Sequence, residues 1–79
     1  MSEHILSSDE AAAIALEKYG PGWVAQDGPN LDYKWAWHAL EPWVEYGTWN
    51  IWGSQLIGPG HPNPEWRSTA QRIERKRDA

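Results

Sequence analysis

The chain has 79 residues, no cysteine and a formal net charge of −4. The length fits one domain rather than two, and the lack of cysteine excludes disulfides and thiolate metal sites. No apolar run is long enough to span a bilayer, and the first ten residues lack the pattern of a signal peptide. We therefore expect one small soluble domain over residues 1–79, with 1–6 and 78–79 frayed, in the cytoplasm.

The charges are distributed unevenly along the chain. Residues 1–62 hold eight acidic and two basic residues, a balance of −6, whereas residues 63–79 hold five basic and three acidic residues, a balance of +2. The first part is expected to attract basic surfaces and to repel phosphate backbones. A modest negative charge also serves solubility, and on charge alone we favour that interpretation.

Tryptophan is the unusual component, with seven Trp, three Tyr and no Phe. One explanation is that Trp replaces Phe in the core. However, each large aromatic side chain buries about 150–250 Å², so seven would need more than about 1,000 Å² of a very small interior. We therefore expect some Trp side chains at the surface, where this residue is common in binding hot spots.

The first predicted element is a helix over residues 8–19. Ser7 and Glu10 have the spacing of a capping box, and the alanine-rich run that follows favours a helix. Gly20 and Pro21 are typical of a helix end. The apolar stripe is expected to comprise Ala12, Leu16 and Tyr19.

The middle of the chain indicates strands. Residues 23–26 form a short first strand, residues 27–30 a turn, and residues 31–39 alternate in the period-two pattern of a half-buried strand. The segment 43–57 is either one long strand bent at Gly47 or a hairpin turning at Gly47–Thr48, and we favour the single bent strand. Trp occurs on both faces of this segment, which suggests that one face of the sheet is uncovered.

A second helix is predicted over residues 64–77. Asn63 has the position of a cap, Pro64 the first helical position, and basic residues gather at the C-terminal end. The fold class is therefore α+β: a helix, a three-stranded antiparallel sheet and a second helix, with both helices on one sheet face. The residues expected to be mostly buried under the helices are Ala12, Leu16, Trp66 and Ile73.

No catalytic constellation is evident. His4, His38 and His61 lack partners at metal-ligand spacing, and His38 is expected at the surface. No serine has a positioned base, and the Gly58–Gly60 segment lacks the register of a phosphate-binding loop. We expect no enzyme activity, no metal and no cofactor.

The predicted order helix–strand–strand–strand–helix resembles the double-stranded RNA-binding domain. In that family a basic cluster near the start of the second helix contacts phosphates. Here residues 64–67 occupy that place, and most of the bases lie at the other end of the segment. Direct nucleic-acid binding is therefore not expected.

A second resemblance is one of class and composition. Small, acidic, cysteine-free and aromatic-rich chains are similar to phage-encoded inhibitors, above all to anti-CRISPR proteins. The resemblance implies a protein partner in the bacterial host cytoplasm. The lack of a long apolar run argues against a membrane, and an uncovered sheet face leaves a monomer and a homodimer both open. The implied activity is to block the nucleic-acid-binding surface of a type I CRISPR effector (Cascade).

Acidic residues and tryptophans are predicted to bind the basic surface of such a partner. The acidic residues supply charge and the tryptophans supply apolar anchors, and at most two of the three Trp are expected to be hot spots. These residues are Asp27, Asp32, Glu41, Glu45, Trp43, Trp49 and Trp52. Two other functions stay open: an aromatic-stacking module that binds RNA or single-stranded DNA through the Arg-rich last helix, and a carbohydrate-binding module with exposed Trp platforms. A small accessory protein with every Trp in its core is the plainest alternative.

Overall fold

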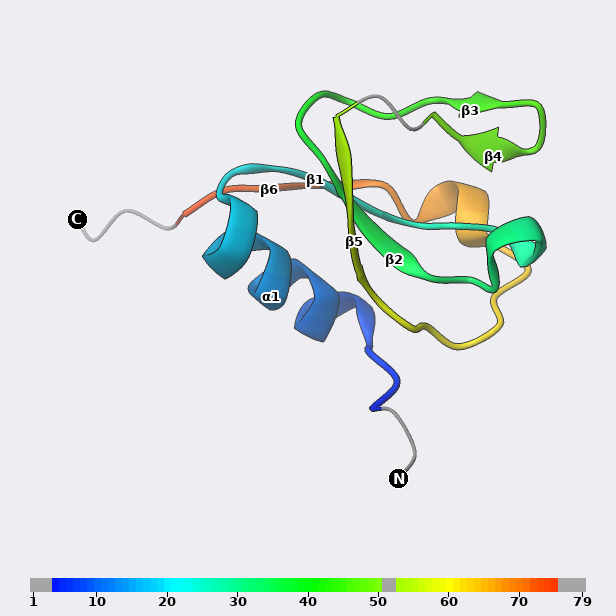
Figure 1. Cartoon of the computed structure of the whole chain (residues 1–79), viewed down its shortest axis with the longest axis horizontal. Coiled ribbons are helices and arrows are strands. Elements are labelled where there is room, and N and C mark those ends of the chain that lie inside the picture. The colour runs from blue at the N-terminus through cyan, green and yellow to red at the C-terminus, as the bar shows by residue number, and fades with distance from the viewer. Residues whose placement is uncertain (1–3, 51–52, 76–79) are drawn as a thin grey trace.

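A computed structural model of the chain describes residues 4–50 and 53–75. One helix packs on one face of a four-stranded antiparallel sheet, and a separate two-stranded hairpin lies apart from the helix (Figure 1). The elements, in chain order, are α1 (Ser8–Tyr19), β1 (Gly22–Gln26), η1 (Pro29–Leu31), β2 (Trp35–His38), β3 (Val44–Glu45), β4 (Thr48–Trp49), β5 (Ser54–Gly58), η2 (Trp66–Ser68) and β6 (Gln71–Ile73). The large sheet has the order β5-β2-β1-β6, so β1 and β2 lie at its centre.

Helix α1 begins and ends where its sequence signals predict. The Glu10 N–H donates to Ser7 Oγ at 3.2 Å, and the Ser7 N–H donates to a Glu10 carboxylate oxygen at 3.0 Å. The buried side chains, however, are Ala11 and Ala15, whereas two members of the expected stripe, Ala12 and Leu16, are half-buried. Alanine has a small side chain, so the helix lies close to the sheet along this line.

The two faces of the sheet bury different residues. Val24 pairs with Trp37, and Gln26 with Trp35, on the side that α1 covers. On the opposite side, Ala25 joins Trp49 and Trp66 in a second cluster, in which the two indole rings meet edge to face with centroids 6.2 Å apart. The hairpin and η2 therefore cover part of the face that we expected to be open.

The predicted fold class is wrong because residues 4–50 and 53–75 form one α-helix, a four-stranded sheet and a two-stranded sheet, not two helices on three strands. Residues expected to form the second helix make the short turn η2 and the strand β6. Thr69 Oγ1 donates to the Trp66 carbonyl at 2.6 Å and accepts the Gln26 N–H at 2.8 Å, and β6 then pairs with β1. Pairing with a distant strand thus overrides local helix propensity, and the order that resembles the double-stranded RNA-binding domain is absent.

Burial in this segment was predicted better than its conformation. Trp66 and Ile73 are both buried, as expected, although neither lies on an α-helix. An apolar residue at the right spacing marks the core side of a segment even where the secondary structure is misread. The end of the predicted second helix, residues 76 and 77, lies outside the described residues.

The central strands are also shorter than predicted. The expected strand over residues 31–39 is reduced to β2, because Asp32 and Tyr33 both have a positive φ, 55° and 56°, which ends an extended backbone. The favoured single bent strand over 43–57 is wrong as well. It is replaced by the β3–β4 hairpin, which turns at Tyr46–Gly47, and by β5; residues 51 and 52 lie outside the described residues.

The N-terminal segment is held in place from Leu6 onward. We expected residues 1–6 to fray, but Leu6 is buried and its N–H donates to the Pro59 carbonyl at 2.9 Å. Residues 1–3 and 78–79 lie outside the described residues. Over residues 4–50 and 53–75, no helix has the length and apolar character needed to cross a membrane.

Candidate functional site

The β3–β4 hairpin and the segment that leads into it expose large apolar side chains to solvent. Tyr46 is 95% exposed, Leu40 78% and Trp43 50%. Glu41 and Glu45, also exposed, stand beside them in the chain. These five residues, Leu40, Glu41, Trp43, Glu45 and Tyr46, are called the hairpin surface below.

The register of the hairpin explains why Trp43 points outward. Val44 pairs with Trp49, and the Trp49 indole N–H donates to the Gln26 carbonyl of the main sheet at 2.7 Å. Trp43 precedes Val44, so strand alternation places its side chain on the opposite side of the hairpin. Asn50 fixes the Trp43 backbone from the neighbouring strand, with hydrogen bonds of 3.1 and 2.9 Å.

The tip of the hairpin is an unfavourable place for a tyrosine. Tyr46 and Gly47 are the two turn residues and have φ values of 54° and 80°. A two-residue turn with both φ positive favours Asn-Gly or Asp-Gly, because a side chain with a bulky ring is strained there. A non-glycine residue in this region costs about 1–2 kcal/mol. The chain thus keeps an aromatic ring at a solvent-facing position where folding favours a smaller residue.

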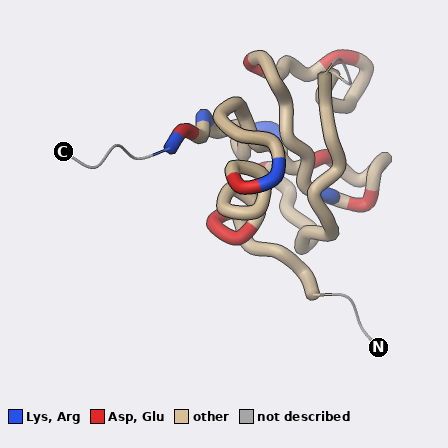
Figure 2. Tube along the Cα trace, turned by 60° about the vertical axis from the view of Figure 1, so that its left-hand side comes forward, with Lys and Arg blue, Asp and Glu red and all other residues tan. Residues whose placement is uncertain are grey.

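The hairpin surface is also acidic. Asp32, which follows η1, is exposed like Glu41 and Glu45. Asn30, in η1, lies close to the hairpin turn, since a Cβ on Gly47 would stand 3.7 Å from its Nδ2. In Figure 2 acidic residues are spread over the molecule, and basic residues lie near the C-terminal end and also on the helix and next to an acidic stretch on the opposite side. The five residues of the hairpin surface include two acidic and no basic side chains, which suits a positively charged partner.

The structure brings some of the predicted binding residues to the surface and not others. Those exposed are Asp32, Glu41, Glu45 and Trp43. Asp27 and Trp49 are buried, 8% and 5% exposed, so their assignment to a binding surface is corrected. Trp52 lies outside the described residues. Sequence reasoning missed Tyr46 and Leu40; the Tyr-Gly pair between two short β-forming runs was the signal for a turn that exposes Tyr46.

Two titratable groups that are not part of the hairpin surface are buried. Burial raises the pKa of the Asp27 carboxyl to about 6. Burial lowers the pKa of His38, which we expected at the surface but which is 2% exposed. Neither ring nitrogen of His38 has a hydrogen-bond partner within residues 4–50 and 53–75. Both groups therefore reduce stability in their charged form.

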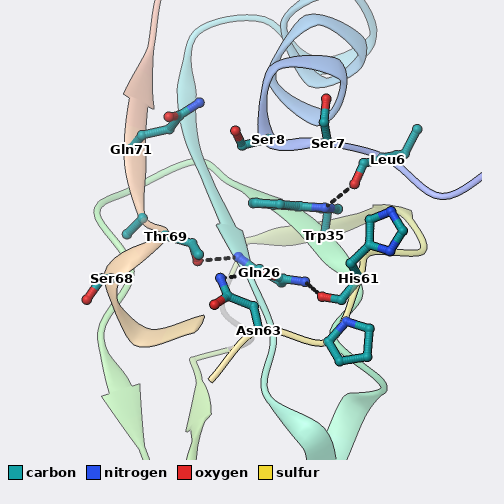
Figure 3. Close-up of a pocket in the computed structure, with 12 residues that line it drawn as sticks. Leu6, Ser7, Ser8, Gln26, Trp35, His61, Asn63, Ser68, Thr69 and Gln71 are labelled. Carbon is teal, nitrogen blue, oxygen red and sulfur yellow. Dashed lines mark hydrogen bonds between the residues drawn. The ribbon is translucent and has the colours of Figure 1, made fainter. Parts of the chain in front are cut away.

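A pocket of about 520 Å³ opens where α1 begins (Figure 3). Gln26 and Trp35, neighbours across β1 and β2, lie at its centre, with the start of α1 on one side and the segment 68–71 on the other. The complete lining is Leu6, Ser7, Ser8, Gln26, Trp35, His61, Pro62, Asn63, Ser68, Thr69, Ala70 and Gln71.

Gln26 holds the base of this pocket together. Its side-chain amide donates to the carbonyls of Tyr33 and His61, at 3.0 and 2.6 Å, and accepts from the Asn63 amide at 3.3 Å. Trp35 donates its indole N–H to the Leu6 carbonyl at 3.0 Å. The Gln26 amide is buried and has three hydrogen-bond partners that hold it in one position. The base of the pocket is therefore rigid.

The described part of the chain contains no group of three or more His, Cys, Asp or Glu side chains placed to hold a metal ion. The hairpin surface and the uncharged pocket beside α1 are two features that could contact another molecule. Comparison of the chain with protein-family models, with curated proteins and with solved structures finds no match.

Proposed function

We propose that this domain works by binding another protein through the hairpin surface, and that the partner presents a basic groove. The observation that carries the proposal is Tyr46, an aromatic side chain 95% exposed at a turn position that disfavours it. Strain at an exposed position is consistent with a use outside the fold, because folding by itself would select a smaller residue there.

The geometry supports tight binding by a small surface. Tyr and Trp bring large contact areas with few rotatable bonds, so ordering them on binding is inexpensive in entropy. The hairpin that carries them is anchored by Trp49 in the second cluster, and this anchor restricts its motion before a partner arrives. Preorganisation of this kind improves affinity.

The acids around the aromatic side chains favour a partner rich in Lys and Arg. Exposed carboxylates mainly accelerate association and select the partner, whereas buried aromatic anchors slow dissociation. The grooves of nucleic-acid-handling complexes have the required charge. Together with the resemblance in class and composition, this makes inhibition of a type I CRISPR effector the first activity to test.

Of the alternative functions, RNA or single-stranded DNA binding through an Arg-rich last helix has lost its structural basis. Residues 71–73 form a strand, and Trp66 is buried with the Arg67 guanidinium 5.0 Å from its ring centre. A buried ring is not available to stack on bases.

The test measures association and dissociation rates with a purified type I effector at low and high salt. Tyr46→Asn keeps the turn, and Trp43→Ala removes the other aromatic anchor. We expect each to speed dissociation and to weaken binding by about thirtyfold or more if the residue is a true anchor. The double variant Glu41→Lys, Glu45→Lys should mainly slow association and weaken its salt dependence.

Leu56→Ala is the matched control, since Leu56 is 60% exposed on β5, outside the hairpin surface. Its rates should equal those of the unmodified protein. Absence of binding to the effector would refute the effector as partner. Binding that is insensitive to Tyr46 and Trp43 would refute the hairpin surface, and tight binding of the free protein to RNA would refute the proposed class of partner.

A further inference from the structure

The pocket beside α1 differs from the hairpin surface in chemistry. Its twelve lining residues include no Asp, Glu, Lys or Arg, although the chain holds eighteen such residues. It combines apolar surface from Leu6, Trp35 and Pro62 with hydroxyl, amide and imidazole groups. We propose that this pocket binds a neutral, hydroxyl-rich small molecule of the size of a mono- or disaccharide.

The volume fits such a ligand. Pockets that enclose small molecules measure about 300–1,000 Å³, and this one measures about 520 Å³. Figure 3 shows its side chains arriving from four parts of the chain: the start of α1, the central strands, the loop that carries His61 and Asn63, and the segment 68–71. A site built from several segments on a rigid base resembles a preformed binding site.

The hydrogen-bonding groups of the pocket divide into two sets. Those at the base are engaged within the protein: Gln26 with three partners, Asn63 with Gln26, and Thr69 with Trp66. Those at the rim have side chains with no hydrogen-bond partner in the described part of the chain. The rim residues are Ser8, His61, Ser68 and Gln71.

The rim determines the class of ligand. Serine hydroxyl and glutamine amide groups each both donate and accept hydrogen bonds, as sugar hydroxyls do, and the histidine ring nitrogens add further hydrogen-bonding atoms. An anionic ligand such as a phosphate would lack a cationic side chain, and a cationic ligand would lack a carboxylate. Gln71 pairs with Val24 and so projects from the face that α1 covers, across the pocket from Ser8.

A second hollow in the molecule provides a contrast. It measures about 580 Å³ and is bordered by His4, Glu17 and Lys18 among others. Its charged rim would favour a charged ligand, whereas the pocket beside α1 has no Asp, Glu, Lys or Arg side chain to pair with one. Titration with matched neutral and charged sugars therefore distinguishes the two.

The experiment is an NMR titration of the isotope-labelled protein at pH 7 with methyl glucoside and maltose as neutral probes. Glucuronate and glucosamine serve as the charged counterparts. We expect saturable shifts of the Trp35 indole N–H and the Gln26 side-chain amide with a neutral probe, and much smaller shifts with the charged ones. Gln71→Ala and Ser68→Ala should each weaken binding about three- to tenfold, as expected for one lost hydrogen bond.

Gln55→Ala is the matched control, because Gln55 is an exposed glutamine on β5, outside the pocket. It should bind the neutral probes like the unmodified protein. Backbone spectra confirm that each variant is folded. Lack of saturable shifts with either neutral probe, equal binding of the charged sugars, or unchanged binding by both rim variants would each overturn the proposal. All these outcomes leave the hairpin surface untouched, so the two proposals fail separately.

Discussion

Four of the seven tryptophans of this chain fall into two groups with different environments. Trp35, Trp37 and Trp49 each donate an indole N–H to a main-chain carbonyl, at 3.0, 3.1 and 2.7 Å. Trp43 is half exposed and lies in the hairpin surface. The first group therefore serves the fold, whereas the half-exposed ring of Trp43 is available to a partner.

The comparison explains the absence of Phe. The three bonded indoles reach the carbonyls of Leu6, Gly20 and Gln26, residues 17 to 29 positions away in the chain. Phe would fill the same space but has no donor, so those carbonyls would lose a partner. A high count of Trp is thus not by itself evidence of a binding surface, because a small core can use indole as both filler and donor.

The sharpest test of the two groups is a pair of alanine variants. Trp49→Ala removes a buried ring, its edge-to-face contact with Trp66 and its bond to Gln26, and should lower the free energy of unfolding by about 3–5 kcal/mol. Trp43→Ala should change it by less than about 1 kcal/mol. Urea denaturation measures both. Equal losses would show that the hairpin surface is structural.

A second variant tests the strand that replaced the predicted helix. Ile73 is 7% exposed and pairs with Gly22 at the edge of the sheet. Ile73→Ala should lower the free energy of unfolding by about 2–4 kcal/mol. The exposed neighbour Arg72 provides the control, and Arg72→Ala should stay within about 0.5 kcal/mol. Similar effects of the two changes would argue against β6.

A third variant tests how stability depends on pH. The pKa of Asp27 is about 6 in the folded protein against 3.8 when exposed, so the folded state gains a proton first and stability rises as the pH falls from about 6 to 4. Asp27→Asn should therefore raise the free energy of unfolding at pH 7 by about 1–3 kcal/mol and abolish that rise. Urea denaturation at pH 7 and pH 5 measures it.

His38 acts in the opposite direction. Its pKa is lowered from 6.5 by burial, so the unfolded state gains the proton first and stability falls as the pH drops below about 6.5. In the Asp27→Asn variant, the stability that protonation of Asp27 adds at low pH is absent. The loss of stability caused by protonation of His38 should then be seen without it. A variant whose stability stays flat between pH 7 and pH 5 would contradict the burial of His38.

The smallest expected change in the free energy of unfolding is an increase. Tyr46→Asn places a residue that tolerates positive φ in the hairpin turn and should raise the free energy of unfolding by about 0.5–1 kcal/mol. Thermal melting of the variant beside the unmodified protein checks this. A variant that is less stable would mean that the Tyr46 ring contributes to folding.

The sequence predicted the local features and missed the distant ones. The helix over residues 8–19 was found because its capping box and its Gly20 end are local signals. The last strand was mistaken for a helix because its pairing with β1 depends on residues far away in the chain. The burial of Trp49 was missed for the same reason. Ala25 and Trp66, which pack against it, lie far from it in the sequence.

The pairing of β1 with β6 has a consequence for how the chain is made. Gly22 and Ile73 are partners although 50 residues lie between them. During synthesis β1 and β2 are complete long before β6 leaves the ribosome, so one edge of β1 stays unsatisfied meanwhile. Open strand edges recruit other chains. A chain truncated before Gln71 would therefore leave this edge of β1 unpaired and be prone to aggregation.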